Sequence, residues 1–269
     1  MRVPFVKMHG AGNDFIVLRD PPPQTLAPAR IAALCDRHTG IGCDQLIVVG
    51  HAPGVAATMA IYNADGSESG ACGNATRCVA DLLRRAGGPA RMAIRTAAGT
   101  LLAEIGSDGL VTVDMGRPAL GWRDIPLARA ADTLHVPLPG DPAAVSMGNP
   151  HVTFFGQSVD AVTTLGPRYE TDALFPERVN VGVAEVLAAD RMRLRVWERG
   201  AGLTLACGSG ACAAVVNAHR RGLCGRTVRV TMDGGALTIA WRADDHVLMT
   251  GPVATSYEGT FDQMEPPSP

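Results

Sequence analysis

Lysine is almost missing from this chain of 269 residues. Lys7 is the only lysine among 24 lysine and arginine residues, so the other 23 are arginine. A Schiff base to pyridoxal phosphate needs a lysine, and only Lys7 could form one. A Walker A loop is excluded as well, because no glycine-rich loop precedes Lys7 and Met8 follows it. An enzyme acting beside an amino group would here work without pyridoxal phosphate.

Long runs of charge and of apolar residues are also missing. The net charge is −2 and no long run of one sign occurs, which disfavours nucleic acid and anionic membranes as partners. No apolar stretch approaches the roughly 20 residues that span a bilayer. Residues 1–7 lack the apolar region of a signal peptide. We therefore expect a soluble, cytoplasmic protein with no nucleic-acid or membrane partner.

The seven cysteines are an odd number without the spacing of a small disulfide-rich domain, which predicts reduced thiols in the cytosol. A zinc site made from Cys35, His38 and Cys43 would match no common ligand spacing, so no metal site is expected. Five cysteines lie in apolar or mixed surroundings, where we expect buried structural thiols: Cys35, Cys43, Cys78, Cys212 and Cys224.

The other two cysteines, Cys72 and Cys207, each stand in the pattern Ala-Cys-Gly before an apolar, Ala-rich run. These runs predict helices over 74–85 and 209–221. A thiol at a helix N-terminus lies beside unpaired N–H groups and the positive end of the dipole, which favours its thiolate. Two such thiols suit a reaction in which a proton leaves one face of a carbon and returns on the other.

The chain is internally duplicated beyond the cysteines. Subtracting 72 from 207 gives an offset of 135 residues, which aligns Asn63 with Glu198 and Gln45 with Asn180. At an offset of 136, Gly12-Asn13 aligns with Gly148-Asn149. A single long period indicates two similar domains, and the length fits two domains of about 130 residues.

Each half predicts an α+β domain of short strands around one cysteine-led helix. These helices lack a clean polar stripe, and a helix that is apolar on all sides is usually buried. We therefore expect two pseudo-symmetric domains, each a barrel-like mixed β-sheet around a central helix; a helix packed on one face of an ordinary sheet is the alternative. The Pro-rich stretch 117–142 is the predicted linker. A further helix is expected over 29–37, and strands over 3–8, 15–18, 45–49, 58–62, 91–96, 100–105, 110–114, 151–155, 179–186, 191–197, 227–232, 236–241 and 246–250.

Proton removal from the α-carbon of an amino acid requires a base, an opposing acid and stabilisation of the developing charge. Backbone amides at the two helix starts can hold a carboxylate, at Gly73-Asn74 and Gly208-Ser209. Glu198 offers an acceptor for an ammonium and Arg199 a forked donor for a carboxylate. His151 can set the protonation state of a neighbouring thiol. Five side-chain amides beside turns or strand ends can form hydrogen bonds with both the ammonium and the carboxylate of an amino acid: Asn13, Gln45, Asn63, Asn149 and Asn180.

Six segments of the chain resemble the diaminopimelate epimerase family. They occur in order from residue 8 to about residue 214, and the two cysteine motifs are specific in combination with Trp197-Glu198-Arg199-Gly200. The other segments are Met8–Phe15, Tyr62–Ser67, Ala71–Asn74, Gly148–Val152 and Ala206–Gly208. The resemblance implies a cofactor-independent isomerase that interconverts LL- and meso-diaminopimelate for lysine and cell-wall synthesis.

The resemblance also implies the organisation of the site. One domain would span residues 1–118 and a C-terminal strand at about 253–269, and the other residues 119–252, in a homodimer. Cys72 and Cys207 would be the base and acid pair, and His151 and Glu198 would adjust their pKa values. The residues expected to bind the small amino-acid substrate are Asn13, Gln45, Asn63, Gly73, Asn74, Asn149, Asn180, Glu198, Arg199, Gly208 and Ser209.

Two positions depart from the family pattern. Ala75 stands where glycine is common and adds a methyl group at a tight helix start, whereas Ser209 stands where threonine is common and keeps the hydroxyl. Two other functions remain open. A related two-cysteine racemase could act on proline or histidine, although Arg199 and the amides favour a substrate with two amino-acid head groups. A dithiol redox protein could use Cys72 and Cys207 as a reversible disulfide, and it would exchange no substrate α-proton.

Overall fold

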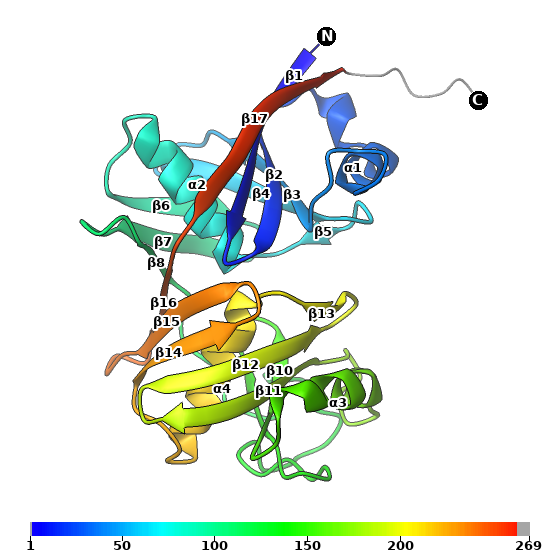
Figure 1. The fold of residues 1–269 in the computed structure, drawn as a ribbon, viewed down its shortest axis with the longest axis vertical. Coiled ribbons are helices and arrows are strands. Elements are labelled where there is room, and N and C mark those ends of the chain that lie inside the picture. Colours follow the sequence, from blue (N-terminus) through cyan, green and yellow to red (C-terminus); the bar gives the residue numbers. More distant parts are fainter. Residues whose placement is uncertain (1, 263–269) are drawn as a thin grey trace. The chain divides into compact units, whose positions relative to one another are not determined.

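The computed structural model describes residues 2–262, which form two compact units (Figure 1). Unit 1 comprises residues 2–10, 14–111 and 252–262, and unit 2 comprises residues 11–13 and 112–251. Our sequence analysis placed the boundary at 118/119, whereas the chain contacts divide at 111/112. None of the helices in residues 2–262 has the length and apolar character that a membrane-spanning helix requires.

Unit 1 holds two helices, α1 (Pro28–Cys35) and α2 (Gly73–Arg85), and a 3₁₀ turn, η1 (Pro23–Leu26). The predicted C-terminal strand is β17, and its register with β1 runs antiparallel from Arg2↔Asp262 to His9↔Ala254, as Figure 1 shows in red and dark blue. Residues 263–269 of that prediction lie outside the described residues. The strands are β1 (Arg2–Gly10), β2 (Asn13–Arg19), β3 (Gln45–Gly50), β4 (Ala57–Asn63), β5 (Glu68–Ser69), β6 (Arg91–Thr96), β7 (Gly99–Ile105) and β17 (Ala254–Asp262).

Unit 2 holds α3 (Val162–Tyr169), α4 (Gly208–Arg220) and a 3₁₀ turn, η2 (Val159–Ala161). The strand β8 (Val111–Asp114) begins at the end of unit 1 and pairs with β16. The other strands are β9 (Ala143–Ser146), β10 (Pro150–Phe155), β11 (Asn180–Ala188), β12 (Arg191–Glu198), β13 (Gly202–Thr204), β14 (Thr227–Met232), β15 (Gly235–Trp241) and β16 (Val247–Gly251).

The two units repeat one order of strand pairing. In unit 1, β2 runs parallel to β3, β3 antiparallel to β4, β4 antiparallel to β5 but parallel to β6, and β6 antiparallel to β7. The same relations hold in unit 2 for β10, β11, β12, β13, β14 and β15. The register repeats as well, since Phe15 pairs with Gln45 as His151 pairs with Asn180. The predicted duplication is confirmed.

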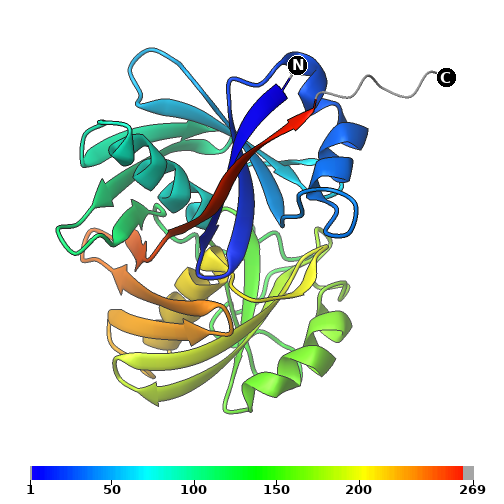
Figure 2. The same cartoon turned by 45° about the horizontal axis from the view of Figure 1, so that its top comes forward.

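Each unit buries one cysteine-led helix of 13 residues against its strands. In unit 2, α4 contacts β9 to β12 and also β15 and β16, so the sheet curls around the helix (Figure 2). Small residues such as Ala211, Ala213 and Ala214 are fully buried there and allow the strands to approach closely. In unit 1, residues 73–80 of α2 are buried, and the helix contacts β1, β6 and β7. This α+β architecture is the one that the sequence predicts.

The segment 117–142 is not the predicted linker, because it packs within unit 2. Ile125, Leu127 and Val136 are buried in an apolar cluster beneath α3. Prolines and charged residues at the surface gave this stretch the composition of a linker, yet its widely spaced apolar residues fill a core. The helix α3 and the strands β5, β9 and β13 were not predicted. The predicted helices and longer strands otherwise agree with the structure to within two residues at each end.

Candidate active site

Cys207 caps the N-terminus of α4 through its sulfur. Its backbone is extended (φ −121°, ψ 109°), and its Sγ accepts a hydrogen bond from the N–H of Gly210 at 3.4 Å. This cap satisfies one of the N–H groups that every helix start leaves unpaired. A Cβ atom at Gly210 would lie only 3.1 Å from that Sγ, so glycine gives the thiol its space. The sequence thus places a buried thiol at the positive end of the helix.

Glu198, the last residue of β12, accepts a hydrogen bond from the Cys207 thiol. The Sγ of Cys207 donates to Glu198 Oε2 at 3.1 Å. The other carboxylate oxygen, Oε1, accepts a hydrogen bond from the hydroxyl of Thr204 at 2.6 Å. The short strand β13 supplies this threonine, because it pairs back on β12 immediately before the cysteine. Each carboxylate oxygen therefore has one fixed donor.

This environment keeps Cys207 protonated. Burial raises the pKa of the thiol well above its ordinary value, and the negative charge of Glu198 and the hydrogen bond to it raise it further. The Ser209 hydroxyl and the Gly210 N–H oppose that shift, and their effect is smaller. A helix N-terminus favours the thiolate at both cysteines and does not distinguish them. At Cys207, burial and a carboxylate nine residues earlier in the chain act against the helix dipole and raise the pKa of the thiol.

His151 reaches the thiol through Ser209. Its Nε2 lies 2.9 Å from Asn149 Oδ1 and 3.1 Å from Ser209 Oγ, and Ser209 Oγ lies 3.6 Å from the Cys207 Sγ. Because the ring is fully buried, and Arg199 adds a positive charge, the pKa of His151 falls from 6.5 to about 3. The imidazole is therefore neutral near pH 7. Since an amide oxygen only accepts, Nε2 carries the ring hydrogen.

Asn180 and Arg199 are joined at the neighbouring strand ends. The Oδ1 of Asn180 accepts from the backbone N–H of Arg199 at 2.9 Å, and its Nδ2 donates to the carbonyl of Pro150 at 2.8 Å. The guanidinium of Arg199 is exposed and donates to the carbonyl of Glu177 at 2.9 Å. The predicted residues of unit 2 thus form two bonded groups, one around Cys207 and one around Asn180.

Cys72 occupies in unit 1 the place that Cys207 occupies in unit 2. Its backbone is extended (φ −147°, ψ 110°), and its Sγ accepts from the N–H of Ala75 at 3.5 Å at the start of α2. The extra methyl of Ala75 is fully buried without displacing this cap. The side chain of Asn74 accepts from the guanidinium of the fully buried Arg77 at 2.9 Å. Gly73 and Asn74 supply the first backbone groups of the helix, as Gly208 and Ser209 do in α4.

Gln45 and Asn63 lie opposite each other in β3 and β4. The Nε2 of Gln45 donates to Asn63 Oδ1 at 3.0 Å, and Asn63 Nδ2 donates to the Ser67 hydroxyl at 3.0 Å. Asn13 begins β2 after a tight turn in which Gly12 has φ +89°. A Cβ atom at Gly12 would come within 2.9 Å of the backbone of Gly234, so the turn needs glycine.

Sequence reasoning missed Thr204 and Arg77, which hold predicted site residues in place. A signal for Thr204 was present in the repeat, because the offset of 135 aligns it with the hydroxyl of Ser69. The register confirms this alignment, since Ile61 pairs with Ser69 as Val196 pairs with Thr204. No comparable signal indicated Arg77, because a charged side chain is usually exposed, whereas this one is fully buried.

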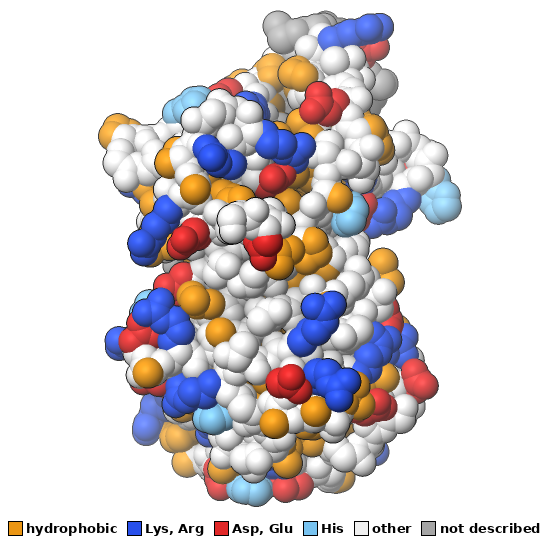
Figure 3. Space-filling model, turned by 60° about the vertical axis from the view of Figure 1, so that its left-hand side comes forward, with side chains coloured by type: hydrophobic (Ala, Val, Ile, Leu, Met, Phe, Trp, Pro, Cys, Tyr) orange, Lys and Arg blue, Asp and Glu red, His pale blue; other side chains and the backbone are white. Residues whose placement is uncertain are grey.

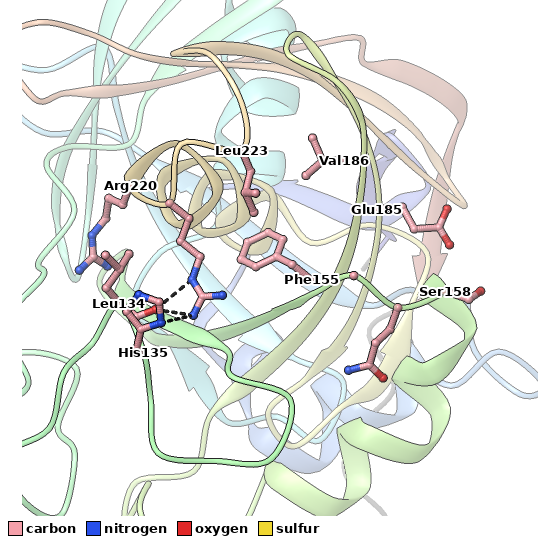
Figure 4. A pocket seen from close by; sticks show the side chains of 11 residues that line it. Leu134, His135, Phe155, Ser158, Glu185, Val186, Arg220 and Leu223 are labelled. Atoms are coloured by element: carbon pink, nitrogen blue, oxygen red, sulfur yellow. Dashed lines mark hydrogen bonds between the residues drawn. The ribbon is translucent and has the colours of Figure 1, made fainter.

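A separate groove of about 1090 Å³ lies in unit 2, and none of the predicted site residues lines it (Figure 4). Its cationic side chains are already engaged. Arg221 donates twice to the carbonyl of Leu134, at 2.9 and 2.6 Å, and pairs with Asp141 at 3.2 Å. Arg220 donates to Thr133 Oγ1 at 2.9 Å and to the carbonyl of Ala144 at 3.0 Å. These guanidinium groups brace the surrounding loops.

The described surface and side chains add two observations. On the face drawn in Figure 3, Lys and Arg side chains are interspersed with Asp and Glu and do not gather into a field of one sign. Within residues 2–262, no group of three or more His, Cys, Asp or Glu side chains is placed to hold a metal ion.

Comparison with known proteins identifies the family. A family model described as diaminopimelate epimerase matches residues 5–121 and 143–256. The diaminopimelate epimerase of Acidiphilium cryptum is 61% identical over 266 residues, which cover 96% of both chains. That of Gluconobacter oxydans is 57% identical over 266 residues, covering 97% of this chain and 99% of its own.

Solved structures share the fold at much lower identity. A PhzF-family phenazine biosynthesis protein from Bacillus anthracis matches with a TM-score of 0.71 at 14% identity, over 97% of this chain and 99% of that chain. A probable proline racemase from Agrobacterium radiobacter K84 matches with a TM-score of 0.69 at 15% identity, over 97% and 93%. The family model and the close relatives together cover nearly the whole sequence, and this chain therefore belongs to the diaminopimelate epimerase family.

Proposed function

We propose that this protein is a cofactor-independent epimerase that interconverts LL- and meso-2,6-diaminopimelate in the cytoplasm, for lysine and peptidoglycan precursor synthesis. The observation that carries this proposal is the pair of N-cap thiols, Cys72 and Cys207, at equivalent positions of the two repeats. Family membership supports the substrate. The same repeat supports the division into two epimerase domains.

The reaction requires both thiols to act on one α-carbon when substrate is bound. A thiolate removes the α-proton from one face, and a thiol delivers a proton to the other face, so the configuration inverts and the two sulfurs exchange charge states. Cys207 is buried and donates to Glu198, so it begins as the acid. Cys72 then begins as the base for the isomer that presents its proton to it. The opposite isomer uses the thiols in reversed roles.

The remaining predicted residues have chemically distinct tasks in this proposal. N-terminal amides of α2 and α4 hold the reacting carboxylate and the charge that develops beside it. Arg199 is exposed and charged, which suits a carboxylate of the substrate. Neutral His151 acts on Cys207 through Ser209, whose hydroxyl lowers the pKa of the thiol, so it favours the thiolate when Cys207 is the base, without adding charge. The substrate-binding set is Asn13, Gln45, Asn63, Gly73, Asn74, Asn149, Asn180, Glu198, Arg199, Gly208 and Ser209.

Isotope exchange tests this proposal directly. The reduced protein, without added cofactor, is incubated with LL-diaminopimelate in deuterated water, and α-deuterium uptake and the stereoisomer ratio are followed by NMR and chiral chromatography. We expect uptake together with conversion towards the meso form. Cys72→Ala and Cys207→Ala should abolish conversion, whereas Cys224→Ser, which changes a cysteine outside the proposed site, should retain it.

Proline and histidine serve as parallel substrates. Exchange on either of them, without exchange on diaminopimelate, would replace our substrate by that of a related racemase. Absence of exchange on all three, with thiol oxidation as the only chemistry, would favour the dithiol redox alternative.

We also propose that the protein acts as a homodimer, as its family resemblance implies. Sedimentation of the purified protein should then give twice the 28.0 kDa mass of one chain. A species of single mass at working enzyme concentrations would contradict the dimer and leave the chemistry untouched.

A further inference from the structure

Two buried thiols face each other at the C-terminal end of α1, in unit 1. The Sγ of Cys43 lies 3.3 Å from the Sγ of Cys35 and donates to it. Cys35 is the last residue of α1, and Cys43 stands two residues before β3 begins. Both side chains are nearly fully buried, with 3% and 2% exposure. Neither thiol takes part in the proposed epimerase chemistry.

Backbone hydrogen bonds hold the two cysteines next to each other. The N–H of Cys43 donates to the carbonyl of Cys35 at 3.1 Å, and the N–H groups of Ile41 and Gly42 donate to the carbonyl of Leu34 at 3.0 Å. The main chains of the two cysteines therefore lie side by side, which is the first condition for bridging them. Gly40 makes the close turn possible, because a Cβ atom there would lie 2.1 Å from the carbonyl oxygen of Ala33.

The surroundings make one of the two thiols the nucleophile. The hydrogen bond from Cys43 lowers the pKa of Cys35; burial opposes this shift, and the charge of Lys7 adds to it. The same hydrogen bond, together with burial, raises the pKa of Cys43. Lys7 lies close by, donating to the carbonyl of Gly42 at 2.5 Å. Lys7 also pairs with Asp14, whose negative charge raises the pKa of Cys35. A thiol whose pKa is lowered by a neighbouring thiol is the more readily ionised member of such a pair, and its thiolate is the nucleophile.

We propose that Cys35 and Cys43 are a modification site that forms a reversible intramolecular disulfide with a small-molecule disulfide such as glutathione disulfide. The Cys35 thiolate attacks one sulfur of glutathione disulfide, forming a mixed disulfide and releasing one glutathione thiolate. Cys43 then loses its proton to the released thiolate and attacks the Cys35 sulfur. The second glutathione leaves as a thiolate and takes up a proton from solvent. Two protein thiols are oxidised, and one glutathione disulfide is reduced to two glutathione molecules.

Access to the pair comes through the turn that covers it. Residues 36–40 are exposed, and the reaction requires this surface turn to open locally and bring Cys35 to solvent. The new bond closes a ring over residues 35–43 and fixes the chain immediately ahead of Gln45. The proposal concerns only unit 1 and holds whatever reaction the protein catalyses.

Tryptic mapping tests the site sharply, because Arg37 lies between the two cysteines. Cleavage after Arg30, Arg37 and Arg77 puts Cys35 in peptide 31–37 and Cys43 in peptide 38–77. Folded full-length protein is treated with glutathione disulfide, its free thiols are blocked with N-ethylmaleimide in denaturant, and the digest is analysed by mass spectrometry. We expect the two peptides to be joined, and dithiothreitol to separate them. A Cys72→Ala chain leaves Cys43 as the only thiol in peptide 38–77, so the link is unambiguous.

Two control variants complete the test. Cys43→Ser should lose the linked peptide and retain glutathione on Cys35, whereas Cys78→Ser, which alters another buried cysteine of unit 1, should keep the link. The thermal unfolding midpoint of the wild-type protein should rise on oxidation and return on reduction, with no such rise in Cys43→Ser. The proposal would be overturned if Cys35 and Cys43 were both found alkylated, and their peptides separate, after the folded protein is treated with glutathione disulfide. It would also be overturned if the disulfide formed only after the protein is unfolded.

Discussion

Replacing Thr204 by valine measures how much the Thr204 hydroxyl contributes to catalysis by Cys207, the proposed acid. The Thr204 Oγ1 lies 2.6 Å from Glu198 Oε1, while Cys207 Sγ lies 3.1 Å from Oε2. Valine keeps the branched shape and removes the donor, so the carboxylate loses the bond that fixes its orientation toward the thiol. A hydrogen bond to a charged group contributes about 1.5–3 kcal/mol. At about 1.4 kcal/mol for each factor of ten, that loss lowers kcat by about 10- to 150-fold when it acts on the transition state.

The assay measures kcat and KM for LL-diaminopimelate with Thr204→Val, Thr204→Ser and a matched control. Thr204→Val should reduce kcat, because the Thr204 hydroxyl fixes the Glu198 carboxylate that accepts from the Cys207 thiol; KM reports any accompanying loss of substrate binding by Glu198. Thr204→Ser retains the hydroxyl and should recover most of the rate. Thr250→Val is the control, since its hydroxyl bonds to that of Thr112 in the same unit, at 2.8 Å.

Three results would refute this reasoning. The first is a wild-type kcat in Thr204→Val. The second is a serine variant as slow as the valine variant, because the effect would then come from packing. The third is an equal loss in Thr250→Val, which would indicate general destabilisation of unit 2.

Three further predictions concern stability and packing. The pKa of folded His151 lies near 3 and its ordinary value is 6.5, so the unfolded state binds the proton first as pH falls and stability decreases between these values. Between pH 6.5 and 5 the urea-unfolding free energy should fall by about 1.6 kcal/mol more in wild type than in His151→Gln. Gly210→Ala should lower kcat about tenfold or more, because the added Cβ would press on the Cys207 sulfur. Ala75→Gly, at the equivalent position of unit 1, should keep the rate and lower the unfolding free energy by about 1 kcal/mol. Equal effects of the two variants on kcat would contradict this. Gly40→Ala should destabilise the protein by about 2 kcal/mol or more in the same unfolding assay, and a wild-type midpoint would show that the turn can relax.

The sequence predicts much of this fold because the chain is duplicated. Repeated polar positions align the two halves, and the structure places Gln45 and Asn180 at the same point of equivalent sheets. The cysteine-led helices follow from local patterns, since capping and apolar composition are properties of neighbouring residues. Such features can be recognised without knowing what the helix packs against.

Elements that depend on distant partners could not be predicted in the same way. The helix α3 contains Gly166 and Pro167, which are poor helix formers. It forms because it packs on Trp197, where a Cβ at Gly166 would lie 2.4 Å from the indole Cγ. The stretch 117–142 has a linker's composition, yet Ile125 and Val136 find a core built from residues later in the chain. Tertiary burial decides both cases.

The two repeats differ in the charge of the residue at the strand end that corresponds to Glu198. Both cysteines cap a helix with the same geometry, so the helix dipole favours the thiolate equally at both positions. The residue at the corresponding strand end differs, since unit 1 has the neutral amide of Asn63 where unit 2 has the carboxylate of Glu198. That carboxylate accepts a hydrogen bond from the Cys207 thiol. Burial and the carboxylate together raise the pKa of the thiol. A two-thiol reaction needs one sulfur charged and one protonated, and a single Asn-to-Glu difference between the repeats provides unit 2 with the means to keep its thiol protonated.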